Sequence, residues 1–276
     1  MKIPKKILDS ATNKLILTNV IVFLVVWILS LFFKKTIIPY LALQPLAIIN
    51  AQYLWTIVTS MFVHFSLWHL LVNMISLYYV GNFIEKIIGK RRILWVYLLS
   101  GVFASLFWTL VSGFFGTGFF IKIFGDPISF GVGASGAVFG LVGLLSILTP
   151  KNKIYMIAGP LIAIVIEYIL MGILPETSAL MIIIDLLISG YFIFCVICMF
   201  DLSGNMRKFC VPLMLNMWML PLVSIIPLII VCLFVDLPIG NMAHLGGLLF
   251  GVLYGFILKK KYPKKSKLIS KRFEQK

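Results

Sequence analysis

The sequence predicts an all-α polytopic membrane protein, a bundle of about eight transmembrane helices. Of its 276 residues, 61% are hydrophobic and only 12% are charged, whereas a soluble domain has roughly 45–50% apolar and about 25% charged residues. So few charges cannot cover a globular surface. The same composition excludes a disordered chain, a collagen, a coiled coil and a disulfide scaffold.

Eight apolar segments approach the length of about 20 residues that a helix needs to cross a bilayer. We expect helices and not strands, because backbone groups at membrane depth must be hydrogen-bonded within the protein. The first segment is interpreted as a retained span and not as a signal peptide, because Lys34 and Lys35 follow it with no small-residue cleavage pattern. The segments are Leu15–Phe33, Leu67–Ile84, Ile93–Val111, Val132–Leu148, Ile154–Leu174, Ala179–Phe200, Val211–Val235 and Met242–Leu258.

The basic residues predict the orientation. With the N-terminus in the cytoplasm, 21 of the 24 Lys and Arg residues lie on the cytoplasmic side, and only Lys34, Lys35 and Lys122 lie outside. We therefore expect a multi-pass protein of the cell membrane with both termini cytoplasmic. It would be one membrane domain over residues 1–276, with the bundle over residues 15–258 and a basic tail over residues 259–276.

The cytoplasmic bias of the basic residues also explains the net charge of +15 without a nucleic acid. The tail is expected to lie against anionic lipid, at about 1 kcal/mol per basic residue. A nucleic-acid partner is disfavoured, because no folded domain accompanies the tail.

The cysteines predict neither a metal centre nor a disulfide. Cys195 and Cys198 form a C-x-x-C pair inside an apolar span, without further ligands or a thioredoxin-like context. Together with Cys210 and Cys232 they are interpreted as packed thiols. No metal and no organic cofactor is expected.

Three clusters of polar and small residues stand out, since polar groups at membrane depth are functional candidates. The first holds His64, His69 and Asn73, of which the last two lie four apart and share a helix face. The second is the segment 131–136, Gly-Val-Gly-Ala-Ser-Gly, which opens the fourth span at Ser135. The third is the segment 243–251, which carries His244.

All three clusters predict chemistry at one level of the membrane. At 1.5 Å per residue, Ser135, His244, His69 and Asn73 lie roughly 5–10 Å below the outer surface. A serine is a weak nucleophile until a base takes its proton, and His244 can be that base. The side chains of His69 and Asn73 and the Ser135 N–H are the available oxyanion donors. No carboxylate accompanies them, which favours a Ser–His dyad.

On these motifs the sequence resembles the rhomboid family of intramembrane serine proteases, over roughly Tyr53–Lys153 and Asn241–Leu258. The resemblance implies that Ser135 is the nucleophile, that His244 is the general base, and that His69, Asn73 and Ser135 line the oxyanion hole. It implies that Phe139, one turn after the serine, stacks on the His244 imidazole. The other residues to which it gives supporting roles are His64, Gly133, Gly136, Gly247 and Gly251.

The sequence departs from the family pattern in two places. Trp55-Thr56 stands where many rhomboids have Trp-Arg in the first outer loop, which puts the anchoring of that loop in question. Ser135 and His244 are 109 residues apart with three spans between them, where the six-span core has one. Because the number of intervening spans is still odd, the helices that carry Ser135 and His244 both enter the membrane from the outer face. We therefore expect a rhomboid-like six-span core with two additional spans, and which intervening helix serves as the core's fifth stays open.

The expected function is hydrolysis of peptide bonds in or next to transmembrane segments of membrane-protein substrates. One alternative is a non-catalytic rhomboid-like protein that binds membrane clients. The other is a transporter that uses Glu167 and Asp185, the only acidic residues placed inside the added spans. A structural pair of carboxyl groups is the simpler interpretation of those two.

Overall fold

The computed structural model describes residues 9–32, 37–171, 173–175, 178–199, 206–234 and 240–274. The chain divides into two compact units, which are described separately. The core unit comprises Met1–Lys151 and Met217–Lys276, and the inserted unit comprises Asn152–Asn216. The predicted single membrane domain stays a prediction.

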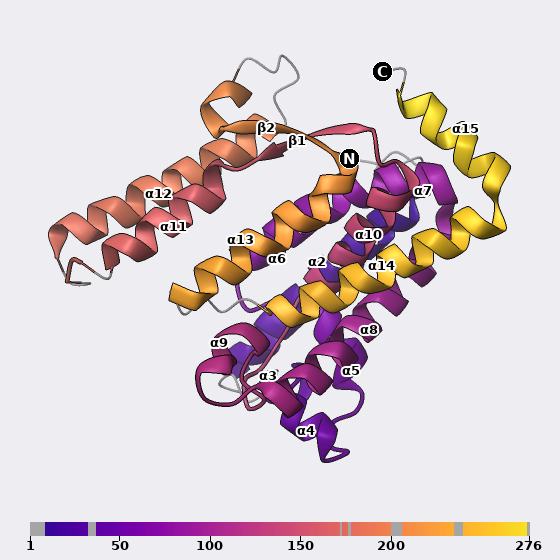
Figure 1. Cartoon of the computed structure of the whole chain (residues 1–276). Helices are drawn as coiled ribbons and strands as arrows, with labels where there is room; N and C mark the ends of the chain where they lie inside the picture. Colours follow the sequence, from indigo (N-terminus) through magenta and orange to yellow (C-terminus); the bar gives the residue numbers. More distant parts are fainter. Residues whose placement is uncertain are drawn as a thin grey trace. The chain divides into compact units, whose positions relative to one another are not determined.

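The core unit is a bundle of apolar helices joined by short helical turns (Figure 1). Its long helices are α2 (Ala11–Phe32), α6 (Leu67–Ser76), which continues through η2 (Leu77–Gly81) into α7 (Asn82–Ile88), α8 (Lys90–Phe115), α10 (Ser135–Leu148), α13 (Leu220–Phe234), α14 (Asn241–Lys261) and α15 (Pro263–Glu274). Its short elements are α3 (Ile38–Leu41), α4 (Pro45–Ile49), α5 (Thr56–Thr59), η1 (Ser60–Phe62), η3 (Gly118–Phe120), α9 (Ile121–Phe124) and η5 (Met217–Met219).

The inserted unit holds a helix pair and a two-stranded ladder. Its elements are β1 (Lys153–Ile157), α11 (Gly159–Met171), α12 (Ala179–Met199), η4 (Arg207–Cys210) and β2 (Pro212–Asn216). Taking both units together, five helical stretches among the described residues are long and apolar enough to cross a membrane. Shorter apolar helices accompany them. The predicted all-α polytopic membrane bundle is thereby confirmed, and each of the eight predicted segments overlaps a helix of the structure.

Three of the eight segments do not begin as helices, and there the sequence-based prediction was wrong. Val132–Leu148 is helical only from Ser135 onward. The segments Ile154–Leu174 and Val211–Val235 begin as β1 and β2, which pair antiparallel with Lys153 opposite Asn216. Proline disfavours helix in the residue before it, and Pro160 and Pro221 stand at the starts of α11 and α13. The extended residues before them pair with each other and so satisfy their backbone groups.

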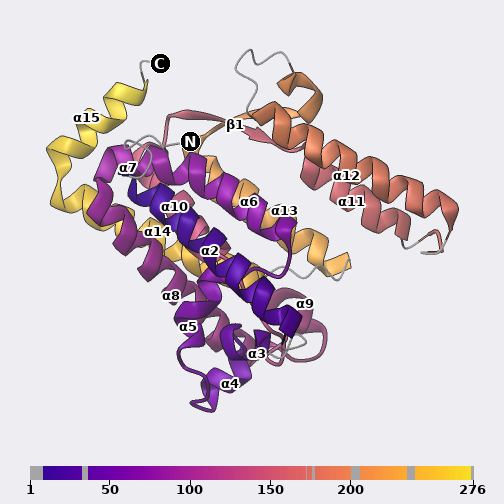
Figure 2. The same ribbon diagram turned by 180° about the vertical axis from the view of Figure 1, so that it is seen from behind.

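The centre of the core unit is the contact between α10 and α14, with α8 beside both (Figures 1 and 2). Glycines allow this approach. A Cβ atom on Gly247 would collide with the carbonyl oxygen of Gly136, and one on Gly251 with that of Gly140. Gly247 and Gly251 therefore form a face of small residues on α14, and α10 contacts that face.

The start of α2 is fixed by a carboxylate from another helix. Glu85 of α7 accepts hydrogen bonds from the backbone N–H groups of Ala11 (3.0 Å) and Thr12 (2.8 Å) and from the hydroxyls of Ser10 (2.8 Å) and Thr12 (2.7 Å). The first N–H groups of a helix have no partner within the helix, so Glu85 caps α2. The start of α2, the end of α7 and the start of α8 thus lie at one end of the bundle.

The loop between α2 and α6 is anchored despite the missing arginine. The Trp55 indole donates to the carbonyl oxygen of Tyr40 (2.8 Å), and the Gln44 amide donates to that of Ile128 (2.7 Å). Leu43 forms a two-bond bridge with Gly131 (2.9 and 2.8 Å). The loop therefore binds directly to the segment that leads into Ser135.

In the inserted unit α11 packs against α12. Cys195, Cys198 and Cys210 are free and buried in one cluster there, as packed thiols would be. The carboxyl groups of Glu167 and Asp185 are neighbours across the two helices, and both side chains are half-buried.

Candidate active site

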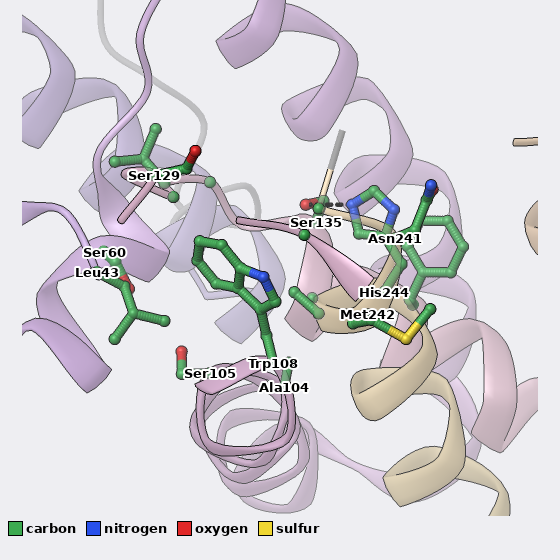
Figure 3. A pocket seen from close by; sticks show the side chains of 18 of the residues that line it. Leu43, Ser60, Ala104, Ser105, Trp108, Ser129, Ser135, Asn241, Met242 and His244 are labelled. Carbon is green, nitrogen blue, oxygen red and sulfur yellow. Dashed lines mark hydrogen bonds between the residues drawn. The ribbon is translucent and has the colours of Figure 1, made fainter. Parts of the chain in front are cut away.

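The structure brings together the serine and the histidine that the sequence placed 109 residues apart. Ser135 is the first residue of α10, and His244 lies in the first turn of α14. The Nε2 atom of His244 is 2.8 Å from the Oγ atom of Ser135 (Figure 3). A base at hydrogen-bonding distance from a hydroxyl is the geometry that activates a serine.

An aromatic ring holds the imidazole. The Phe139 ring stacks on the His244 ring, with centroids 4.3 Å apart and planes 7° from parallel. Phe139 is one turn after Ser135 on α10, so one helix supplies both the hydroxyl and the stacking ring. Among the described residues the Nδ1 atom of His244 has no hydrogen-bond partner, and the contact with Phe139 is what orients the ring there.

The segment before Ser135 is fixed by backbone hydrogen bonds. The Gly133 N–H donates to the carbonyl oxygen of Ser60 (2.8 Å), two residues after the Leu43–Gly131 bridge. Gly133 has φ of +123°, which side chains rarely adopt, and a Cβ atom there would lie 2.8 Å from His69 Nε2. Glycine is therefore required at position 133 both for the backbone conformation and for the approach of His69.

His64 supports this segment from the outer loop. It is only 3% exposed, and its Nε2 atom accepts a hydrogen bond of 3.4 Å from the Ala134 N–H. Burial lowers the pKa of His64 to about 4, and the neighbouring His69 adds to the shift. The ring is therefore neutral at pH 7 and can accept the bond next to Ser135.

The two predicted oxyanion donors, His69 and Asn73, also lie at the site. Both line the same cavity as Ser135 and His244. The Asn73 amide donates 2.9 Å to the His69 carbonyl oxygen one turn earlier on α6, which leaves its second N–H for another acceptor. The His69 ring makes an edge contact with the His64 ring, with centroids 5.0 Å apart.

The cavity has a volume of about 910 Å³ and lies among the outer loop, α6, α8, α9, α13 and α14. In Figure 3 the Trp108 indole of α8 projects between Leu43 and the Ser135–His244 pair. The sequence analysis missed Trp108 and also Asn241, which is 5% exposed and lies three residues before His244. The i, i+3 spacing to His244 was the signal that could have found Asn241.

The sequence did not predict which of the three intervening helices serves as the core's fifth span. Leu228 and Cys232 of α13 line the cavity, whereas α11 and α12 belong to the inserted unit. α13 also packs against α10 and α14. It is therefore the third intervening helix, α13, that holds the place of the core's fifth span.

These features define a class: integral membrane proteins of several spans with a serine and a histidine paired in an internal cavity. The family model of the Rhomboid domain matches residues 51–189 and 186–261, which together are more than half of the chain. The protein belongs to the rhomboid family.

Individual relatives match a shorter region. The chain is 32% identical over 115 residues to RHOMBOID-like protein 1 of Arabidopsis thaliana, covering 41% of this chain and 26% of that protein. It is 31% identical over 100 residues to the putative rhomboid protease YdcA of Bacillus subtilis (strain 168), covering 36% and 43%. It is 33% identical over 99 residues to a protein named inactive RHOMBOID-like protein 8, of Arabidopsis thaliana, covering 36% and 24%. The matches thus span less than half of these curated relatives' length.

Proposed function

We propose that this protein is an intramembrane serine endopeptidase that hydrolyses peptide bonds in or next to the transmembrane segments of membrane proteins. The observation that carries the proposal is the 2.8 Å contact between His244 Nε2 and Ser135 Oγ inside a cavity of about 910 Å³. Membership of the rhomboid family supports it, because one matched relative is named a putative rhomboid protease. Another is named inactive, so the presence of both Ser135 and His244 in this chain is what favours activity.

The reaction would proceed in two steps. The Ser135 oxygen attacks the substrate carbonyl carbon while its proton passes to His244 Nε2. The tetrahedral intermediate collapses, the C–N bond breaks, and His244 returns the proton to the leaving amine. A water molecule then gives a proton to His244 and attacks the acyl-enzyme, which releases the acid and restores the serine.

The negative oxygen of the intermediate needs preorganised donors. The Ser135 N–H is one of the unbonded amides in the first turn of α10. Asn73 has a second amide N–H besides the one bonded to His69, and the His69 ring lies against Gly133, two residues from Ser135. We assign these three groups to the oxyanion hole.

The substrate is inferred from where the site lies. A helix crossing the bilayer hides its carbonyl groups in hydrogen bonds, so a substrate must unwind locally to reach Ser135. The distribution of basic residues favours a site that opens to the outer face, with both termini in the cytoplasm. We propose the cell membrane as its location, although another matched relative is named mitochondrial.

The proposal is tested on the detergent-purified full chain with a transmembrane test substrate and a fluorophosphonate probe. Ser135→Ala should abolish cleavage and labelling, and His244→Ala should reduce both sharply. Ser129→Ala is the matched control, because Ser129 lines the same cavity and has no assigned role. Its activity should stay near that of the unaltered chain.

The same experiment separates the alternatives. Glu167→Gln should leave cleavage unchanged, since Glu167 belongs to the inserted unit. If Glu167→Gln abolished cleavage, and if cleavage in the unaltered chain depended on an added ion, a transporter would be favoured. An unaltered chain that folds and binds the substrate without cleaving it would be a non-catalytic client-binding member. Cleavage that survives in Ser135→Ala would refute the mechanism.

A further inference from the structure

The end of the bundle opposite the candidate active site gathers basic side chains from three helices. α8 starts with Lys90, Arg91 and Arg92, and α14 ends with Lys259, Lys260 and Lys261. Only Tyr262 separates α14 from α15. We name as the basic corner the eight residues Lys90, Arg91, Arg92, Lys260, Lys261, Lys264, Lys265 and Lys267.

Tyr262 joins these helices at one point. Arg92 Nη2 donates to the Tyr262 hydroxyl (3.2 Å), and the Arg92 guanidinium carbon lies 5.0 Å from the centroid of the ring. Lys261 Nζ lies 5.9 Å from the same centroid. Two cations are therefore held beside one ring, although they come from helices far apart in the sequence.

Acidic side chains are few at this end of the bundle, and Glu85 of α7 is already hydrogen-bonded to the start of α2. The sequence from Lys259 to Phe273 contains no acidic residue, and the first turns of α8 and α15 contain none either. Cations stabilise the C-terminal end of a helix, but those of α8 stand in its first turn, where the helix dipole opposes them. The helix dipole stabilises the charges of Lys259–Lys261 but not those of Lys90–Arg92. A bound anion would neutralise the positive charge of both groups.

The position of α15 identifies the source of that anion. α14 is a membrane-spanning helix whose last apolar residue before the lysines is Leu258, and α15 begins five residues later. At 1.5 Å per residue this is roughly 8 Å, the depth of a headgroup layer. Trp95, one turn after Arg91, is 55% exposed, as aromatic residues at the membrane interface are.

The faces of α15 agree with this placement. Lys264, Lys267 and Leu268 are exposed and share one face of the helix, by their i, i+3 and i+4 spacing. Ser266 and Ile269, on the other side, are half-buried. The helix therefore turns its lysines and one leucine outward, at the level where phosphate groups and the first methylenes of lipids lie.

We propose that the basic corner is a binding site for the headgroup of an anionic phospholipid, with α15 lying on the surface of that leaflet. The site depends on the protein's being in a membrane and not on its proposed peptidase activity. It is more than a tail attracted to a charged surface, since Arg92 and Tyr262 fix α8 and the α14–α15 junction around the headgroup.

Binding is measured on the full chain in neutral detergent by native mass spectrometry, with phosphatidylglycerol, phosphatidylcholine or inorganic phosphate added. We expect saturable binding of phosphatidylglycerol, at least tenfold weaker binding of phosphatidylcholine, and no competition by inorganic phosphate at the same concentration. Each lysine at a membrane surface contributes about a fivefold change in affinity. Lys264→Gln/Lys267→Gln should therefore weaken binding of phosphatidylglycerol at least about tenfold.

The matched control is Lys14→Gln/Lys86→Gln, which removes two exposed charges from α2 and α7 at the same end of the bundle. Its affinity should change by less than about threefold. An equal loss in both pairs would show a diffuse surface potential and overturn the site. Equal binding of the two lipids, effective competition by inorganic phosphate, or dimerisation in place of lipid binding would overturn it as well.

A second measurement reports the orientation of α15. A fluorophore attached to Leu268→Cys in bilayer discs should be quenched by brominated lipids more strongly when phosphatidylglycerol is present. The parent chain is the blank for labelling, because its four cysteines are buried. Quenching that is absent with phosphatidylglycerol would refute the placement of α15 on the leaflet, whatever the state of the peptidase.

Discussion

The contact between α10 and α14 makes a quantitative prediction for Gly247→Ala. A Cβ atom on Gly247 would overlap the Gly136 carbonyl oxygen and would lie 2.8 Å from its carbonyl carbon, whereas carbon atoms pack at about 3.5–4.0 Å. The colliding atoms are backbone, so no rotamer relieves them and the helices must separate by roughly 1 Å. The 2.8 Å contact between His244 and Ser135 would then exceed hydrogen-bonding distance.

A displacement of this size at reacting groups costs about 100-fold in rate, and overpacking costs about 1–3 kcal/mol of stability. Initial rates of cleavage of a transmembrane test substrate and unfolding in detergent measure both effects. Gly190→Ala is the control, because nothing lies within 4 Å of that Cβ position. Gly255→Ala, which would meet Ile147 about 12 Å farther along α14 than Gly247, should lose stability but much less activity. A Gly247→Ala chain that cleaves within threefold of the unaltered rate would refute this reasoning.

Three further predictions concern single side chains. Glu85→Gln removes the charged acceptor of four hydrogen bonds to the start of α2 and should lower the unfolding free energy by about 2 kcal/mol. Asp9→Asn, two residues before Ala11, should cost under about 0.5 kcal/mol, and an equal cost of the two substitutions would contradict the capping role. Phe139→Leu should slow cleavage about two- to tenfold through loss of the stacked ring, and Phe139→Tyr should not; equal rates in the Leu variant would show that stacking is unimportant. The pKa of His64 is lower in the folded chain, at about 4, than its ordinary value of 6.5, so the unfolded chain binds the proton more tightly and stability should fall as the pH drops from 6.5 towards 4, by up to about 3 kcal/mol. His64→Gln should lower by about one the number of protons that the chain takes up on unfolding, which is obtained from the slope of the unfolding free energy against pH. If the slope did not change, the pH dependence would belong to other groups.

The sequence alone was sufficient where its signal is local or repeated. Hydropathy located the apolar helices, and the expectation that His69, Asn73, Ser135 and His244 lie near one another agrees with their lining one cavity. Locating the helices needs only helix geometry and the requirement that backbone groups be paired in lipid. The stacking of Phe139 on His244, in contrast, was implied by the resemblance to the rhomboid family.

The sequence was insufficient where partners are distant. The ladder of β1 and β2 pairs residues about 60 positions apart. Hydropathy does not distinguish an apolar strand from an apolar helix, so it predicted helix for these residues. Trp108 enters the cavity because Gly125 and Gly131 leave room against its ring, a packing relation that no spacing reports. The anchoring of the outer loop likewise uses backbone bonds to residues 127–131 in place of an arginine.

The inserted unit leaves the Ser135–His244 pair intact for a reason other than its even number of added spans. Two added spans preserve the direction of α14, but direction alone would not bring His244 to Ser135. The glycine contacts between α10 and α14 set that distance, and they depend only on the two helices that make them. α13 then follows η5, whose Trp218 N–H donates to the Pro150 carbonyl oxygen (3.2 Å), so the chain leaves the core after α10 and re-enters it at the same point. A helix pair closed by its own two-stranded ladder can therefore be inserted there while the groups around Ser135 keep their places.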